Sequence, residues 1–290
     1  MKEQYRNTNF RPESLAKIEK MIEIVDEYQA QGLTLTARQL YYQFVSRDII
    51  PNTQAEYRKL TTLLTDARYA GMIDWDAIED RGRQPETPAD WSSIQRLVDS
   101  ALRSYRLPRW AGQGKHIELW VEKQALAGVL WPLASRFHVT LMVNKGYSSA
   151  SAMYESAERI KAADETENIV FYLGDHDPSG EDMVRDIAQR LEEFGVENLV
   201  VSKLALTMSQ VKKYQPPPNP AKVTDSRSPA YIAKYGNQSW EVDALPPDVL
   251  SRLITTAFED EIDHERMDAV KRREEQDKDA LRKAVAKLTG

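Results

Sequence analysis

The feature that most constrains the fold is an alternation of apolar runs with amphipathic stretches between residues 117 and 206. Each apolar run has the length of a strand, and the stretches between the runs repeat their apolar residues at helical spacing. Parallel strands need long crossover connections, so this order predicts a mostly parallel sheet with helices on both faces. The predicted strands are 117–121, 139–143, 169–173 and 199–206, and the predicted helices are 124–137, 150–163 and 180–195.

The first 110 residues show a different pattern, with three helical stretches close together. Helices are predicted over 12–30, from Thr36 to about residue 50, and over 53–70. Thr36 and Gln39 have the spacing of a capping box, and Gly71 stands where a helix commonly ends. Residues 72–78 are expected to form a short strand or wing. Three short helices and a wing are typical of a winged-helix module, which lays one helix along a DNA groove.

These patterns divide the chain into three parts. Residues 1–110 are predicted to form an N-terminal helix plus a winged-helix DNA-binding domain, which includes a further helix over 91–105. Residues 115–245 are predicted to form an α/β metal-binding catalytic domain, and residues 246–290 a helical C-terminal extension. The charged end of that extension is typical of a solvated helix or a dimer strut. No helix or strand is predicted over 219–236.

Composition excludes several classes of function. The chain has no cysteine, which rules out disulfides, thiolate zinc sites and cysteine nucleophiles. The net charge of -6 does not itself favour a polyanion partner, but residues 1–115 carry 17 Lys+Arg against 16 Asp+Glu, a balance of +1. No apolar run has the length of a membrane span and the polar N-terminus does not resemble a secretory signal, so we expect a cytoplasmic protein without a membrane partner.

The strongest chemical signal is a set of acids at predicted strand ends. Glu122 follows one apolar strand, and Asp175 and Asp177 follow another in the run Leu173–Gly180. Acids at the same edge of a parallel sheet repel each other unless a cation joins them, and hard oxygen ligands suit Mg²⁺. The structural alternative is an acidic turn in which an Asp caps the next helix. His176, between the two aspartates, is expected to face solvent or to contact a phosphate.

The acids and their spacing resemble the Toprim domain. A Glu at a strand end followed by Asp175-His176-Asp177-Pro178-Ser179-Gly180 is similar to the form in the A subunit of topoisomerase VI and in the meiotic double-strand-break transesterase. The segment Lys145-Gly146-Tyr147 resembles a stretch between those motifs. The resemblance covers roughly residues 33–206, with a weaker part around 240–247, and is nearest to the small stand-alone Mini-A proteins. It implies a winged-helix domain before the Toprim domain, as predicted above.

The resemblance also implies a site and partners. It assigns Mg²⁺, with Mn²⁺ as a substitute, to Glu122, Asp175 and Asp177. Arg38-Gln39-Leu40-Tyr41-Tyr42 matches the family's Arg-x-x-aromatic-Tyr pattern, which gives Tyr42 the role of nucleophile and a 5′-phosphotyrosyl product. The family tyrosine acts at the partner subunit's metal, so a homodimer on duplex DNA is expected, associated with the nucleoid. A separate ATPase subunit is a further possible partner.

Helical geometry distinguishes the two adjacent tyrosines. Tyr42 lies four residues after Arg38 and shares its face, whereas Tyr41 falls on the apolar side of the helix and is expected to be core. A phenol with an ordinary pKa near 10 needs a nearby cation to act as a nucleophile, and Arg38 or the metal is the candidate.

Three alternatives remain open: hydrolysis at the metal site without a tyrosine, a non-catalytic DNA-binding subunit, and a phosphatase or phosphotransferase for small molecules.

Further residues are candidates for phosphate or metal contacts. The candidate DNA-binding residues are basic and lie in the predicted winged helix and near the Toprim-like motifs: Arg58, Lys59, Arg68, Arg81, Arg83 and Lys145. Glu241 and Asp243 are candidates for outer contacts to the metal.

Overall fold

The structure is a computed structural model that describes residues 2–79, 88–144, 146, 148–221 and 224–289. Its helices are α1 (Pro12–Gln29), α2 (Ala37–Ser46), α3 (Gln54–Tyr69), α4 (Ile94–Ser104), α5 (Gln124–Phe137), α6 (Ala150–Ala162), α7 (Pro178–Glu193), α8 (Met208–Tyr214), α9 (Ser228–Tyr235), α10 (Pro247–Glu259) and α11 (His264–Thr289). Its strands are β1 (Leu35–Thr36), β2 (Ile78–Glu79), β3 (Lys115–Val121), β4 (Thr140–Val143), β5 (Glu167–Leu173), β6 (Leu199–Ala205), β7 (Asn219–Pro220) and β8 (Gln238–Ser239). Short 3-10 turns span Trp75–Ala77 and Val242–Ala244.

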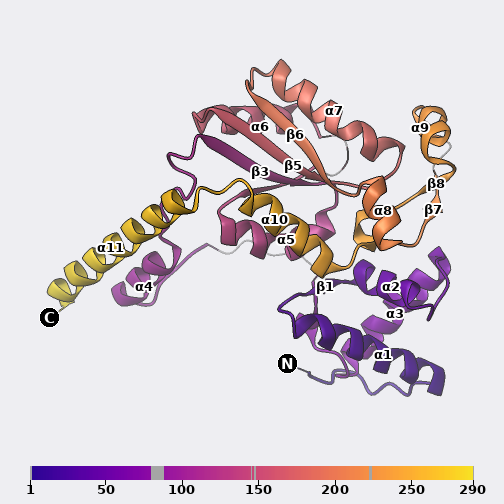
Figure 1. Ribbon diagram of the computed structural model, residues 1–290. Coiled ribbons are helices and arrows are strands. Elements are labelled where there is room, and N and C mark those ends of the chain that lie inside the picture. The colour runs from indigo at the N-terminus through magenta and orange to yellow at the C-terminus, as the bar shows by residue number, and fades with distance from the viewer. Residues whose placement is uncertain (1, 80–87, 145, 147, 222–223, 290) are drawn as a thin grey trace.

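The central layer is a parallel sheet of strand order β4-β3-β5-β6. Side chains alternate between its faces along each strand. Leu119 and Phe171 face α5 and α10, while Trp120 and Tyr172 face α6 and α7. Figure 1 shows these helices above and below the strands. The predicted α/β class, with a mostly parallel sheet flanked by helices, is therefore confirmed.

The N-terminal helices form a second core of their own. Helices α1, α2 and α3 pack around residues such as Met21, Leu40 and Leu64. The predicted capping box is present, because the Thr36 hydroxyl accepts from the Gln39 backbone N–H and the Gln39 side chain accepts from the Thr36 N–H. In Figure 1 this unit lies below one end of the sheet.

The predicted strand or wing over 72–78 was wrong in its extent. Asp74 caps a 3-10 turn at Trp75–Ala77, and the strand itself is β2, whose residues Ile78 and Glu79 pair in parallel with β1. The segment 219–236 also differs from the prediction of no element. It contains β7 and α9, and α9 begins with a proline in its first turn and buries Tyr231.

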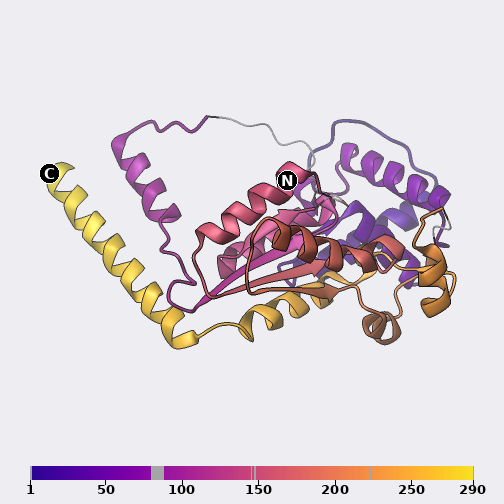
Figure 2. The ribbon, with the colours of Figure 1, turned by 90° about the horizontal axis from the view of Figure 1, so that it is seen from above.

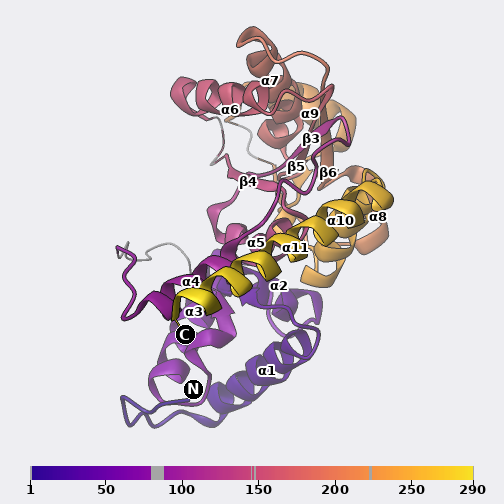
Figure 3. The ribbon, with the colours of Figure 1, turned by 90° about the vertical axis from the view of Figure 1, so that its left-hand side faces the viewer.

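The helical extension consists of two helices with different surroundings. Helix α10 buries Leu250, Ile254 and Phe258 against the sheet, so it belongs to the central core. Helix α11 leaves the body and lies beside α4, as Figures 2 and 3 show. Tyr105 donates to Asp277 and the backbone N–H of Leu107 donates to Glu274, which ties the two helices together.

A buried ion pair joins β3 to α6. Glu118 is fully buried, and its carboxylate accepts from Nε and Nη2 of Arg159 at 2.8 and 2.9 Å and from the Trp120 indole N–H at 2.8 Å. His116 lies 2.9 Å from the same carboxylate. These partners lower the pKa of Glu118 against the opposing effect of burial.

We expect the substitution Glu118→Ala to lower the free energy of unfolding by about 2 to 3 kcal/mol, because it leaves the buried Trp120 N–H without its acceptor and the half-buried Arg159 without its partner. Urea denaturation at neutral pH measures this loss. Glu158→Ala is the matched control, since Glu158 is exposed on α6 and its ion pair with Lys161 is worth less than about 1 kcal/mol. Equal stabilities of the two variants would contradict the assigned role of Glu118.

Candidate functional site at the carboxyl edge of the sheet

Glu122 and Asp175 meet where the winding of the sheet reverses. From one edge of the sheet to the other, the strands are the second, first, third and fourth along the chain. The direction of winding therefore reverses between β3 and β5. The crevice beyond the carboxyl ends of such strands is the usual binding site of open α/β sheets. Glu122 directly follows β3, and its Oε2 accepts from the backbone N–H of Asp175 at 3.0 Å. The predicted convergence of these two acids is present.

Tyr172, a residue outside the predicted site, lies beneath Glu122 and Asp175. Its side chain is fully buried, and its hydroxyl donates to Oε2 of Glu122 at 3.3 Å. Burial raises its pKa well above the ordinary value, with further contributions from Glu122, Asp175 and Asp177. Gly174 makes room for the phenol, because a Cβ there would lie 2.4 Å from the hydroxyl oxygen. In the sequence, the position of Tyr172 under the site could have been inferred only from Gly174, the small residue between the end of β5 and Asp175.

Asp177 has a structural role at the start of α7. Its Oδ1 accepts from the Gly180 N–H at 2.7 Å and from the Ser179 hydroxyl at 2.8 Å. Gly180 is required by the tight turn, since a Cβ there would lie 2.1 Å from the backbone oxygen of Asp175. The helix-capping alternative is therefore confirmed for Asp177, whose carboxylate is mostly buried.

His176 anchors a distant segment to the acidic loop. Its backbone exchanges both hydrogen bonds with Trp240, and its ring Nδ1 lies 2.7 Å from the Tyr231 hydroxyl. The side chain is 1% exposed, so the prediction that it faces solvent or a phosphate was wrong. Val242 N–H donates to Oδ1 of Asp175 at 2.9 Å. This pairing brings the segment 240–243 to the site.

Lys123 lies among three carboxylates. Its ammonium is 2.9 Å from Asp175, 2.7 Å from Glu241 and 3.2 Å from Asp243. Burial alone would lower the pKa of Lys123, but Asp243, Asp175 and Glu241 together raise it above its ordinary value. Lys123 is thus a fixed positive charge at the centre of the site.

Arg38 reaches the same cluster from α2. Its Nε donates to Glu241 at 2.7 Å and lies 3.6 Å from Asp243. Asp243 is 1% exposed, and neither of its carboxylate oxygens has a hydrogen-bond partner within the described residues. Its ion pairs with Lys123 and Arg38 therefore leave acceptor capacity that a bound cation would use.

The cluster carries more negative than positive charge. Glu122, Asp175, Glu241 and Asp243 bring four carboxylates against the two cations Lys123 and Arg38, an excess of two negative charges when all are ionised. Burial raises the pKa of Asp175 to about 7, with Glu122 and Asp243 adding to the effect and Lys123 opposing it. Asp175 is therefore only partly ionised at neutral pH, and a bound cation would favour its charged form.

The residues fit a hard divalent cation in chemistry and charge. The cap uses Oδ1 of Asp177, so the set of Glu122, Asp175 and Asp177 stays a prediction. In the described ranges, no three or more His, Asp and Glu side chains are already arranged around one point as a metal site. Glu122 and Asp175 are adjacent, Asp177 is engaged in its cap, and Asp243 lies across Lys123. Glu122 and Asp175 are the residues that would hold the ion.

Tyr42 is close to the cluster but enclosed. Its side chain is 2% exposed, its hydroxyl accepts from Asn219 at 3.3 Å, and the Arg38 guanidinium lies 5.9 Å from its ring. Burial and the nearby Glu241 raise its pKa to about 12. Tyr41 is buried and donates to Asn52 at 2.8 Å, so its predicted core position is confirmed.

The predicted DNA-contact residues are spread over several surfaces. Arg68 lines a cavity of about 770 Å³ together with Arg38, Glu122 and Asp175, and its guanidinium stacks on Trp75. Lys59 lines a different cavity between α1 and α3, and Arg58 is exposed. Three of the predicted contacts lie outside the described residues: Arg81, Arg83 and Lys145.

Comparison with known proteins does not assign the chain to a family. No protein-family model matches it, and no curated protein matches its sequence. In the described part of the chain, no helix has both the length and the apolar character of a membrane span.

We expect Lys123→Met to destabilise the protein more as the pH rises. Without Lys123 the folded-state pKa values of Asp175 and Asp243 rise further above the unfolded value of about 4, so the cost is absent when these carboxyls are protonated and grows as they ionise. Urea denaturation between about pH 5 and pH 8 should show a widening loss that reaches about 2 kcal/mol or more. Lys161→Met, at an exposed pair, is the control, and a loss that does not change with pH would contradict the cluster's electrostatics.

Proposed function

We propose that this chain is a Toprim-type protein with a winged-helix N-terminal unit, and that it cleaves DNA phosphodiesters in a Mg²⁺-dependent reaction. The observation that carries the proposal is the meeting of Glu122 and Asp175 at the switch point between β3 and β5, in a cluster with an excess of negative charge. Carboxylates placed in this way suit a divalent ion, and phosphoryl chemistry commonly uses one.

The position of the N-terminal unit supports DNA as the substrate. The cavity at the site is lined on one side by Arg38 of α2 and by Tyr57, Thr61 and Arg68 of α3, and on the other by the acids. A DNA backbone bound along α3 would therefore pass within reach of Glu122 and Asp175. Polar and basic residues on a helix are the usual contacts to DNA phosphates.

The burial of Tyr42 favours hydrolysis over tyrosine transesterification. With its pKa raised to about 12, the phenol is a weaker nucleophile than an ordinary tyrosine, and Arg38 is already paired with Glu241. Transesterification is the second candidate, because Tyr42 and Arg38 share one helix face beside the acids. It requires the Asn219 contact to open.

Within the site, each described residue has a distinct task. Glu122 is held by the Asp175 N–H and the Tyr172 hydroxyl, which fix its carboxylate toward the crevice. Lys123 and Arg38 orient the acids and offer positive charge to a phosphate. When bound, Mg²⁺ would supply charge that stabilises the phosphorus transition state. Asp177 positions the loop through its helix cap.

The proposed assembly is a homodimer on duplex DNA, with a separate ATPase subunit as a further proposed partner. Support for the dimer comes from the arm formed by α4 and α11, on which Trp91, Ile94 and Leu97 remain exposed apolar side chains. Exposed apolar residues gathered on one projecting element are typical of a contact surface.

The test is cleavage of supercoiled plasmid in Mg²⁺. We expect Glu122→Gln and Asp175→Asn to reduce cleavage by at least ~100-fold, because removing a ligand charge weakens metal binding at least as much as removing its supporting contacts. Glu193→Gln, exposed on α7, is the control and should cleave like wild type. Cleavage that persists in EDTA, or in Glu122→Gln, would eliminate the metal mechanism.

Denaturing gels of the same reactions separate the two chemical routes. We expect free DNA ends and a Tyr42→Phe variant as active as wild type, since the phenol is enclosed. Protein covalently attached to the ends, lost in Tyr42→Phe, would instead establish transesterification. Wild type that binds DNA but never cleaves it would assign the chain to the non-catalytic class.

A further inference from the structure

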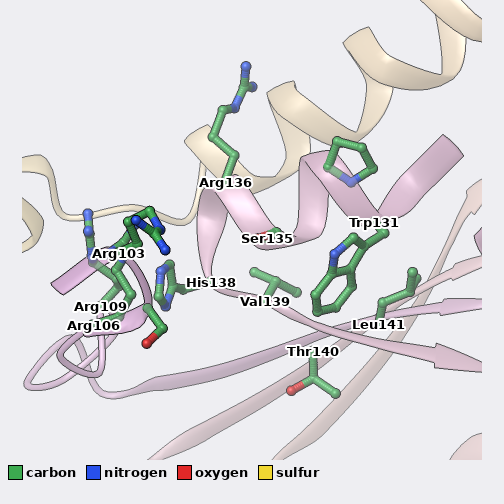
Figure 4. A pocket seen from close by; sticks show the side chains of 12 residues that line it. Arg103, Arg106, Arg109, Trp131, Ser135, Arg136, His138, Val139, Thr140 and Leu141 are labelled. Atoms are coloured by element: carbon green, nitrogen blue, oxygen red, sulfur yellow. The ribbon is translucent and has the colours of Figure 1, made fainter. Parts of the chain in front are cut away.

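Another cavity, lined by several arginines, lies toward the C-terminal end of α5, away from the acidic cluster. It has a volume of about 890 Å³ and opens between α4, the loop after it, the end of α5 and the start of β4. Figure 4 shows Arg103, Arg106 and Arg109 gathered with His138 at one end, and Trp131 with Leu141 at the other. Nothing in the proposed cleavage site uses these residues.

The arginine end carries unbalanced positive charge. Arg109 pairs with Glu274 at 3.0 Å, and Arg106 lies 3.7 Å from the same carboxylate. Arg103 is exposed and has no hydrogen bond or ion pair in the part of the chain that the structure describes. Arg106, Arg109 and Lys278 thus share the single carboxylate of Glu274, and Arg103 adds a further positive charge beside them. Arginine is the side chain best shaped to bind a phosphate.

The other end of the cavity offers an aromatic surface. Trp131 is 48% exposed although it lies on a helix whose opposite side is buried in the core. The guanidinium of Arg136, between the two ends, points away from the cavity and donates to Thr255 at 3.1 Å. The cavity is therefore divided into an arginine end and an apolar, aromatic end. A ligand that fits both ends of the cavity carries a phosphate for the arginines and a planar aromatic ring that stacks on Trp131.

We propose that this cavity binds a nucleotide unit of single-stranded nucleic acid, with its phosphate at Arg103 and Arg106 and its base stacked on Trp131. Single strands expose base faces that duplexes hide, and an aromatic platform beside basic residues is the usual way to hold them. The open form of the cavity lets a strand enter and leave, which suits a polymer. A free nucleotide shares the same chemistry and is separated by the test.

Helix α5 connects this cavity to the acidic cluster. The helix begins directly after Lys123 and ends at Phe137, so at 1.5 Å per residue Trp131 lies about 12 Å, and the arginine end of the cavity about 20 Å, along the helix from the acidic cluster. Binding of a single strand in this cavity does not require cleavage of DNA. It can therefore be tested without metal, and its result does not depend on whether the proposed cleavage function is correct.

The experiment is fluorescence anisotropy of a labelled fifteen-residue oligo-dT strand, in EDTA and low salt. We expect Trp131→Ala to weaken binding about tenfold, the usual loss for one stacked base. Arg103→Ala should weaken binding and reduce the slope of log affinity against log salt by about one. The matched controls are Tyr154→Ala, which removes a 51% exposed phenol on α6 outside the cavity, and Arg96→Ala on α4. Both controls should bind like wild type.

Two further ligands identify what occupies the cavity. A duplex of the same length should show no dependence on Trp131, and thymidine monophosphate should compete at least ~100-fold more weakly than the strand, since a polymer makes several phosphate contacts. The proposal is overturned if Trp131→Ala and Arg103→Ala bind the strand like their controls, or if wild type does not bind it. Competition by the mononucleotide at the strand's own concentration would assign the cavity to a free nucleotide instead.

Discussion

The crowding of carboxylates beyond the ends of β3 and β5 is the constraint on which the rest of the site depends. Glu122 and Asp175 are placed together by strand pairing, and Glu241 and Asp243 are added by the bridge between His176 and Trp240. Like charges at this spacing destabilise the fold unless cations lie between them. Lys123 and Arg38 provide two such charges, and the remaining excess favours one divalent ion.

The same electrostatic contacts hold the N-terminal unit against the sheet. Arg38 extends from α2 to Glu241, while Lys123 joins Glu241 to the acids at the strand ends. A movement that separates α2 from the segment 240–243 would break the Arg38–Glu241 contact beside Tyr42. The acidic site and the enclosure of Tyr42 are therefore two consequences of one network, and substrate binding at the cavity would act on both.

Much of the fold was predictable because its information is local. Apolar runs and helical spacing predicted β3, β5 and α5 closely, and Thr36 with Gln39 predicted the start of α2. Parallel-strand geometry alone predicted that Glu122 and Asp175 converge. Glu241 and Asp243 were predicted as outer contacts to the metal, but the long-range pairing that brings them to the site was not predictable. It depends on a backbone bridge between Trp240 and His176, which lie far apart in the chain. The burial of Tyr42 likewise depends on Asn219, and helical periodicity cannot reveal a covering residue from another segment.

An anomalous diffraction map from crystals soaked in Mn²⁺, which substitutes for Mg²⁺ at oxygen sites, would locate the proposed ion. We expect a peak at the switch point, with Glu122 and Asp175 as protein ligands and Asp177 still hydrogen-bonded to the Gly180 N–H. The proposed metal site would be contradicted if crystals saturated with Mn²⁺ showed anomalous peaks only elsewhere, with Lys123 as the only cation among Asp175, Glu241 and Asp243.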